Sequence, residues 1–276
     1  MAGIIFALFS AMSWGTGDFF GGLATRRSSQ FRVLVLTSII GSGLMLMAGL
    51  ILREPWSGWI DVFWAASAGL GGAIGILALY FGLSLGNAAV VSPVAAVLST
   101  VLPLLVSLGT EGLPPPVRLA GLVIAVLGIW QVTRSAEPAD GKRQGGLGLA
   151  FLAGVGFAAF FVLIAQVQEG RVFMPLVISK LTAFGIGLLF LARRREAIFP
   201  FHYDPAMILS AIFDSSGNVF FLLAEQNTRL DIAAVLASMY AAVTVLLSQQ
   251  FLKEKVSFGQ WLGVGLCLLA IGLIVA

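Results

Sequence analysis

The stretch Arg134-Ser-Ala-Glu-Pro-Ala-Asp-Gly-Lys-Arg-Gln-Gly-Gly146 is the most polar interior segment of the chain, and it lies near the middle of the 276 residues. On each side of it, the sequence divides into five apolar runs that are separated by short polar breaks. An apolar run of about 20 residues is long enough to cross the hydrocarbon layer of a membrane as a helix. The sequence therefore predicts an all-α integral membrane protein with ten transmembrane helices.

Helices are expected rather than strands, because an open strand in lipid leaves its backbone N–H and C=O groups unpaired. The predicted spans are 3–23, 33–52, 61–83, 88–108, 117–133, 147–167, 174–192, 205–224, 232–251 and 257–275. The chain then consists of a first five-helix unit (1–133), a polar linker (134–146) and a second five-helix unit (147–276).

The composition excludes several classes of protein. Hydrophobic side chains make up 59% of the chain and charged ones 11%, whereas soluble domains carry about 25% charged residues. A soluble enzyme, a nucleic-acid-binding protein and a secreted disulfide-rich domain are therefore excluded. The one cysteine, Cys267, lies in the last apolar run, and the one histidine, His202, lies in a predicted loop. We expect no metal site, no cofactor and no catalytic residues, because an intramembrane enzyme needs a nucleophile with its base or metal ligands at membrane depth.

The two units resemble each other when one is shifted along the other by 143 residues, so that Gly3 aligns with Gly146. The aligned pairs also include Ala7 with Ala150, Trp14 with Phe157, Ser67 with Ser210, Leu79 with Leu222, and Glu111 with Glu254. Because five is an odd number, the second unit must enter the membrane from the opposite side. Two inverted repeats are typical of secondary transporters, whose substrate site lies near the midplane between the halves.

The orientation follows from the basic residues in the loops. The first, third, fifth, seventh and ninth loops hold eleven Lys and Arg residues, and the other four loops hold four. Cytoplasmic loops carry the excess of positive charge. The sequence therefore predicts a multi-pass protein of the cell (inner) membrane. Both termini are expected outside the cell membrane and the basic loops in the cytoplasm. Met1 to Ser13 contains no Lys or Arg, so we interpret this region as the retained first helix rather than a signal peptide.

Several motifs resemble those of EamA-type members of the drug/metabolite transporter superfamily. They are Ser13-Trp14-Gly15-Thr16-Gly17-Asp18-Phe19-Phe20-Gly21-Gly22, Val91-Ser92-Pro93 with Pro103 and Glu111, and Val235-Leu236-Ala237-Ser238-Met239-Tyr240 followed by Val243-Thr244-Val245-Leu246-Leu247 and Glu254. The resemblance covers nearly the whole chain. It implies ten helices in two inverted repeats that exchange small metabolites, often amino acids or related compounds and commonly outward. Many relatives have proline after the tyrosine of the ninth-helix motif, whereas this chain has Ala241, so a proline kink is not expected there.

Three ionisable residues fall inside the predicted helices: Asp18, Lys180 and Asp214. Each costs about 2.5–3.5 kcal/mol near the bilayer centre when it is unpaired. They must therefore face a hydrated cavity, pair with one another, or both. One aspartate can neutralise Lys180, which leaves the other free to take up a proton. Asn218 lies four residues after Asp214 and so shares its helix face.

Aromatic side chains complete the candidate site, although each of them could equally pack between helices or lie at the membrane interface. The predicted substrate-binding residues are Trp14, Asp18, Tyr80, Phe157, Phe161, Lys180, Asp214, Asn218 and Tyr240. A purely structural role is the alternative for each charged residue. Glu111 and Glu254 lie in short turns, where we expect each to cap the helix that follows.

These features predict a secondary active transporter that exports small organic metabolites by alternating access, with proton coupling through Asp18 or Asp214. The alternative is an uncoupled facilitative exchanger of the same fold, in which the intramembrane charges only hold the helices in place. A channel is a further alternative, although no ring of like residues is evident. The expected partners are a small-molecule substrate, a proton and the lipid bilayer, with the chain acting as a monomer or a homodimer.

Overall fold

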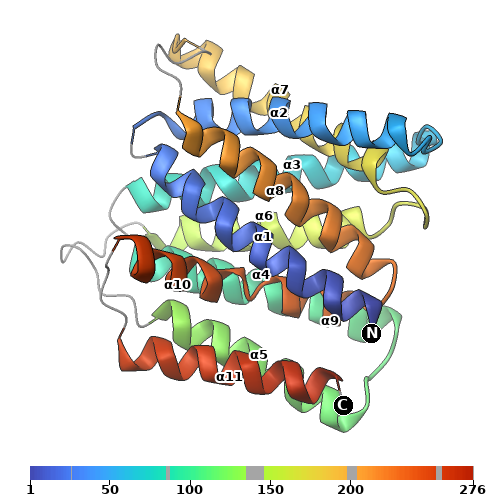
Figure 1. The fold of residues 1–276 in the computed structure, drawn as a ribbon, viewed down its shortest axis with the longest axis vertical. Helices are drawn as coiled ribbons and strands as arrows, with labels where there is room; N and C mark the ends of the chain where they lie inside the picture. Colours follow the sequence, from blue (N-terminus) through green and yellow to red (C-terminus); the bar gives the residue numbers. More distant parts are fainter. Residues whose placement is uncertain (26, 85–87, 135–145, 198–203, 253–256, 276) are drawn as a thin grey trace.

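The computed structural model describes residues 1–25, 27–84, 88–134, 146–197, 204–252 and 257–275, which form a bundle of helices (Figure 1). The helices are α1 (Ala2–Thr25), α2 (Gln30–Ile51), α3 (Trp59–Ser84), α4 (Ala88–Thr110), α5 (Pro116–Arg134), α6 (Gly146–Ile164), α7 (Phe173–Arg194), α8 (Pro205–Glu225), α9 (Leu230–Ala237), α10 (Tyr240–Leu252) and α11 (Phe258–Val275). Residues 135–145 of the predicted linker and Glu254 lie outside the described residues.

The all-α membrane fold and its ten spans are confirmed, because α9 and α10 follow one another within the predicted ninth span. Among the described residues, α1, α2, α3, α7 and α8 are long and apolar enough to cross a membrane, judged by length and composition. The ends of the spans lie within three residues of the predicted ones. Hydropathy locates such helices well, since every backbone polar group in lipid must be paired within its own helix.

The second half is inverted relative to the first. Along α1, Gly3 lies against Asn227, Gly17 against Asp214 and Gly21 against the Ser210 side chain, so α1 and α8 are antiparallel. Because α1 and α3 run in the same direction (Figure 1), the third helix of the second half runs opposite to the third helix of the first. Both termini lie at one end of the bundle, which we name the terminal end (Figure 1). The distal end is the one with the α1–α2 and α7–α8 connections.

The packing of the helices repeats when the two halves are exchanged. Helix α1 packs on α8, and its equivalent α6 packs on α3. Likewise, α2 packs on α8, and its equivalent α7 packs on α3. Helix α4 packs on α6, and in the same way α9 and α10 pack on α1. Helices α2 and α7 pair with each other, and so do α5 and α11. The sequence repeat therefore corresponds to a structural repeat, and the two halves meet along shared helix faces.

The ninth span is interrupted, although the sequence predicted one continuous helix over 232–251. Helix α9 ends at Ala237 and α10 begins at Tyr240. Between them the backbone tightens, because the Met239 N–H donates to the oxygen of Leu236 over 3.2 Å, three residues back instead of four. The expectation of a continuous helix was wrong. The interruption occurs without proline, at a point where α9 is enclosed by α1, α4, α5 and α8.

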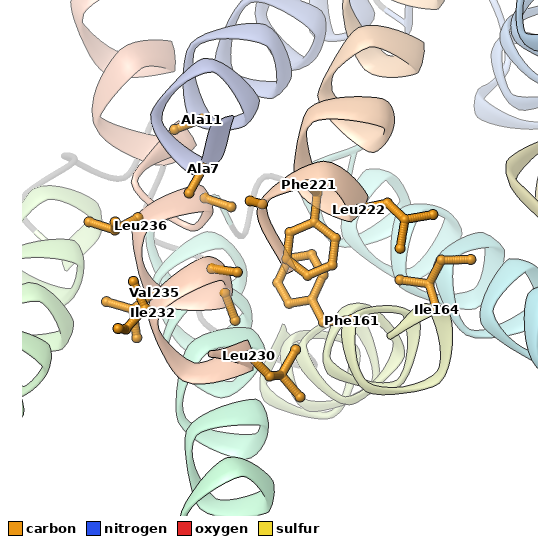
Figure 2. Packing of buried hydrophobic residues seen from close by; sticks show 14 of the residues in the cluster. Ala7, Ala11, Phe161, Ile164, Phe221, Leu222, Leu230, Ile232, Val235 and Leu236 are labelled. Carbon is orange, nitrogen blue, oxygen red and sulfur yellow. The ribbon is translucent and has the colours of Figure 1, made fainter. Parts of the chain in front are cut away.

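Helix α9 belongs to the main hydrophobic core. All eight of its residues are buried, and Figure 2 shows several of them beside apolar side chains of α1, α6 and α8. The labelled core residues are Ala7, Ala11, Phe161, Ile164, Phe221, Leu222, Leu230, Ile232, Val235 and Leu236. Seven of these residues are apolar, and the eighth, Asp231, is paired with Arg229. A helix that is apolar on nearly all sides is stable in a surrounded position. The core therefore fixes the middle of the ninth span, next to the two helices α1 and α8 that carry the predicted aspartates.

Glycine permits close backbone contact between the halves. A Cβ atom at Gly69 of α3 would lie 2.3 Å from the carbonyl oxygen of Ser179 on α7, and backbone atoms cannot rotate away. Overpacking of this kind costs about 1–3 kcal/mol. We expect Gly69→Ala to lower the melting temperature in detergent by several degrees. Gly185→Ala is the matched control, because no described atom lies within 4 Å of a Cβ there. Equal melting temperatures for the two variants would contradict the contact.

Candidate functional site

A cavity lies between the two halves, near the middle of the bundle. Its walls come from α1, α2 and α3 of the first half and from α6, α7, α8 and α10 of the second. Its volume is about 90 Å³, which is room for several water molecules at about 15 Å³ each. A chamber formed jointly by inverted repeats at mid-membrane is where secondary transporters hold their substrates.

Eight of the nine predicted site residues line this cavity. They are Trp14, Asp18, Phe157, Phe161, Lys180, Asp214, Asn218 and Tyr240. Tyr80, the ninth, is not part of the lining. A Cβ atom at Gly21 would lie 2.7 Å from the Tyr80 hydroxyl and 3.0 Å from Ser210 Oγ, so the structure places this hydroxyl between α1 and α8.

The cavity also has a wall that sequence reasoning missed. Helix α2 contributes Leu34, Thr37 and Ser38, and Phe160 and Ser179 flank residues that were predicted. The adjacent polar residues Thr37 and Ser38 were a signal, since they interrupt an otherwise apolar span. On α7, Ser179 stands next to Lys180, which was predicted, and so gave a similar signal. Packing between α2 and α7 brings the two walls together.

Lys180 and Asp214 form an ion pair across the cavity, from α7 to α8. From one turn further along α8, the Asn218 amide nitrogen donates to the backbone oxygen of Asp214 over 2.5 Å and to its carboxylate over 3.3 Å. The Lys180 and Asp214 side chains are 12% and 22% exposed. Pairing removes most of the cost of holding each charge at this depth. Lys180, Asp214 and Asn218 therefore form a network with no net charge.

Asp18 is the charge left over. Within the part of the chain that the structure describes, no residue donates a hydrogen bond to its carboxylate or forms an ion pair with it. Asp18 lines the cavity from α1. The approach of α1 to α8 is close at this level, since a Cβ atom at Gly17 would lie 3.0 Å from the Asp214 nitrogen. Protonation of Asp18, or binding of a cationic group, would lower the free-energy cost of holding this carboxylate inside the membrane.

An aromatic cluster lies on the side of the cavity that is nearer the terminal end. The Trp14 ring stacks on Phe161 and Phe221 with centroids 5.5 and 5.6 Å apart, and Phe161 stacks on Phe221 at 4.5 Å (Figure 2 shows the last pair). Phe221 is completely buried. Along α1, Trp14 precedes Asp18 by one turn on the way from the terminal end. The rings therefore separate the charged part of the cavity from that end.

Polar links join the halves beyond the aromatic cluster, at the terminal end. Asp61 of α3 accepts a hydrogen bond from Arg171, in the α6–α7 connection, over 2.7 Å. Glu111, which we expected to cap α5, instead accepts hydrogen bonds from the Ser107 hydroxyl over 2.8 Å and from the Leu230 N–H at the start of α9 over 3.4 Å. That expectation was wrong, because the α4–α5 and α8–α9 connections lie side by side and α9 presents the nearer unpaired N–H groups.

Arg229 strengthens the same contact. Its guanidinium donates to Asp231 over 3.0 Å and to the carbonyl oxygen of Gly112 over 2.6 Å. The hydrogen bond to Asp231 raises the pKa of the Arg229 guanidinium above its usual value, so this cation stays charged at any pH that the protein meets. In the described ranges, no cluster of three or more His, Cys, Asp or Glu side chains could hold a metal ion.

Comparisons with known proteins agree with this geometry. A solved crystal structure of a protein superimposes with a TM-score of 0.72 over 98% of this chain and 95% of the other, at 18% sequence identity. That likeness shows the shared fold. A search of curated proteins finds no match. The model of the EamA-like transporter family matches twice, over residues 1–134 and 144–276, so that each half of the chain is one copy of the family's repeat. The chain belongs to the EamA-like transporter family, within the drug/metabolite transporter superfamily.

Proposed function

We propose that this protein is a secondary active transporter that exports small organic metabolites, such as amino acids, by alternating access with proton coupling. The observation that carries the proposal is the Asp18 carboxylate, which faces the cavity between the halves without a described partner. Asp214 already neutralises Lys180. Of the two aspartates, Asp18 is thus the one that can gain or lose a proton without breaking an ion pair.

Two further features of the cavity support an amino acid as the substrate. Helix α10 begins inside the membrane at Tyr240, and Tyr240 lines the cavity. The start of a helix carries partial positive charge, which favours an anion such as a carboxylate. Asp18 would favour an amino group, and the Trp14, Phe160 and Phe161 rings would cover an apolar side chain. Both charges of a zwitterion would then find a complement.

We propose that the distal end faces the cytoplasm of a cell with an inner membrane. The basic residues concentrate in the connections at that end, as the positive-inside rule describes. The aromatic cluster and the polar links lie on the opposite side of the cavity, so a substrate would enter from the cytoplasm. This direction fits export.

The Lys180–Asp214–Asn218 network favours a second candidate function, the uncoupled facilitative exchanger. A complete network with no net charge can hold α7 against α8 without taking part in transport. In that case a substrate gradient alone would drive the flux.

The experiment that tests the proposal is counterflow of labelled amino acids in proteoliposomes, measured with and without an imposed proton gradient. A coupled transporter accumulates solute against its gradient when protons flow. An exchanger shows counterflow that the proton gradient does not change. The absence of counterflow for every amino acid tested would contradict the proposed substrate class.

A further inference from the structure

Each half of the protein carries the same short element after its second helix. Arg53 after α2 and Arg195 at the end of α7 are the two non-glycine residues with positive φ in the described chain, at 53° and 55°. The following residues, Glu54 and Glu196, each close the helix with a backbone hydrogen bond, of 2.9 and 3.0 Å. An aspartate comes next at the start of the third helix of each half. Because the halves are inverted, the two elements lie at opposite ends of the bundle.

At the terminal end this element joins the two halves. The Glu54 carboxylate accepts hydrogen bonds from the backbone N–H groups of Phe173 and Met174, at the start of α7, each over 2.9 Å. Asp61 is 1% exposed. It accepts from Arg171 over 2.7 Å and from a backbone N–H of the α6–α7 connection over 3.0 Å. Both carboxylates of the first half are thus bound by donors of the second half.

At the distal end the equivalent carboxylates are not bound in this way. Asp204 Oδ2 is buried without a hydrogen bond, and it lies 3.8 Å from Arg27, whose side chain is 75% exposed. No described residue donates to the Glu196 carboxylate. The start of α2 corresponds to the start of α7. Within the described ranges, the Ser29 hydroxyl is the one side chain that caps it, over a long 3.4 Å. Both ends carry a glutamate and an aspartate, but among the described residues donors of the other half bind both carboxylates at the terminal end only.

The remaining contacts at the distal end do not replace these links. The Arg32 guanidinium donates to the carbonyl oxygen of Ala197 over 2.9 Å, and Arg194 lies 4.9 Å above the Phe31 ring. They hold α2 against α7. These are the second helices of the two halves, so exchanging the halves leaves this pair of helices unchanged. None of them involves Asp204 or Glu196.

We propose that these two carboxylate sets are alternating gates. In the described state Glu54 and Asp61 close the terminal end. In a second state Glu196 binds the start of α2, the long ion pair of 3.8 Å between Asp204 and Arg27 tightens to a direct hydrogen bond, and these links close the distal end. The inference rests on the proposed transport function, because alternating access requires two such states. Each link that breaks at one end is replaced by its equivalent at the other, so that the two states remain close in free energy.

The inner faces of the two gates differ, which favours closure at the terminal end. Under the 143-residue shift, Phe161 corresponds to Asp18, and Phe221 corresponds to Ala78. Two of the stacked rings on the terminal side thus have a carboxylate and a small side chain as their counterparts on the distal side. The rings pack closely with Trp14. They add apolar burial to the polar links of that gate.

Electron paramagnetic resonance distances between spin labels at both ends test the proposal in proteoliposomes without substrate. One label pair is placed at Trp56 and Glu169 of the terminal end, and the other at Ser28 and Arg193 of the distal end. Cys267, which is buried, is replaced by Ala in both. The gate variants are Asp61→Asn and Asp204→Asn. Asn keeps the size of the side chain and one acceptor oxygen. In Asp204→Asn this oxygen can still accept the hydrogen bond that Asp204 receives from the Ala206 N–H over 2.9 Å.

We expect Asp61→Asn to lengthen the terminal-end distance and to shorten the distal one. The ratio of the two populations should change about tenfold, as for the loss of one charge-assisted hydrogen bond. Asp204→Asn should shift the populations in the reverse direction, and the double variant should return toward the wild type. Shifts of both single variants in the same direction, or no shift in either folded variant, would overturn the proposal.

A second pair of variants covers a failure to fold, which gel filtration and thermal melting detect. Arg171→Gln and Arg27→Gln remove the same two links from their cationic sides, and they must give the same reciprocal shifts. Amino acid counterflow is measured in the same vesicles. Reciprocal shifts without any counterflow would refute the proposed transport function and keep the gates, whereas counterflow with unshifted distances would refute the gates alone.

Discussion

Asp18→Asn is expected to abolish proton-driven accumulation of the substrate while counterflow between equal pH values continues. The amide has nearly the shape of the carboxyl group but cannot bind and release a proton. No described residue pairs with Asp18, so its replacement leaves the Lys180–Asp214 network intact. Accumulation should fall by at least about tenfold, to the level seen without a gradient, since no other free carboxylate lines the described cavity. Uptake of labelled amino acid into acid-loaded and neutral proteoliposomes measures both quantities.

Asp18→Glu is the control for this result. It restores a carboxylate one methylene further from α1, and some proton-driven accumulation should return with it. If Asp18→Asn accumulates substrate as the wild type does, with unchanged dependence on the proton gradient, Asp18 does not carry the proton. The facilitative exchanger would then be the better description.

Lys180→Met is expected to be the most destabilising single change in the cavity. It leaves the Asp214 carboxylate without its cation at membrane depth, which costs about 2.5–3.5 kcal/mol. In a chain of this size the melting temperature should fall by about 5–10 °C. Thermal unfolding in detergent, followed by intrinsic tryptophan fluorescence, measures the shift.

The double variant Lys180→Met/Asp214→Asn separates charge from shape. It removes both members of the ion pair, and most of the lost stability should return, because replacing a buried pair is far less costly than breaking it. If Asp18 alone carries the proton, this variant still couples transport to the proton gradient. Loss of coupling in a stable double variant would assign the proton to Asp214 instead.

The number, length and order of the spans followed from the sequence, because lipid requires long apolar helices and hydropathy is a local property. The ninth span is where this reasoning failed. The tightened turn at Ser238 and Met239 has no proline or glycine to announce it. The turn lies next to α9, whose eight residues are all buried, and no local sequence pattern records that enclosure.

The candidate site shows the same division. Helical periodicity placed Asp214 and Asn218 on one face, and the cost of intramembrane charge selected Asp18 and Lys180 in advance. Which aspartate would pair with Lys180 could not be predicted. Periodicity orders residues around one helix, whereas an ion pair depends on the neighbours of that helix. Tyr80 illustrates the point, since its hydroxyl lies against Gly21 of α1 rather than in the cavity lining.

The sequence alone indicated ten apolar spans, a doubled five-helix unit and three charges that are costly inside a membrane. It did not indicate the pairing of Lys180 with Asp214, the free carboxylate of Asp18 or the unequal links at the two ends. Those features depend on which helix lies against which, over sequence separations of 34 residues for the ion pair and 110 for Asp61 with Arg171. Contacts at that range arise only when the packed halves bring distant helices together.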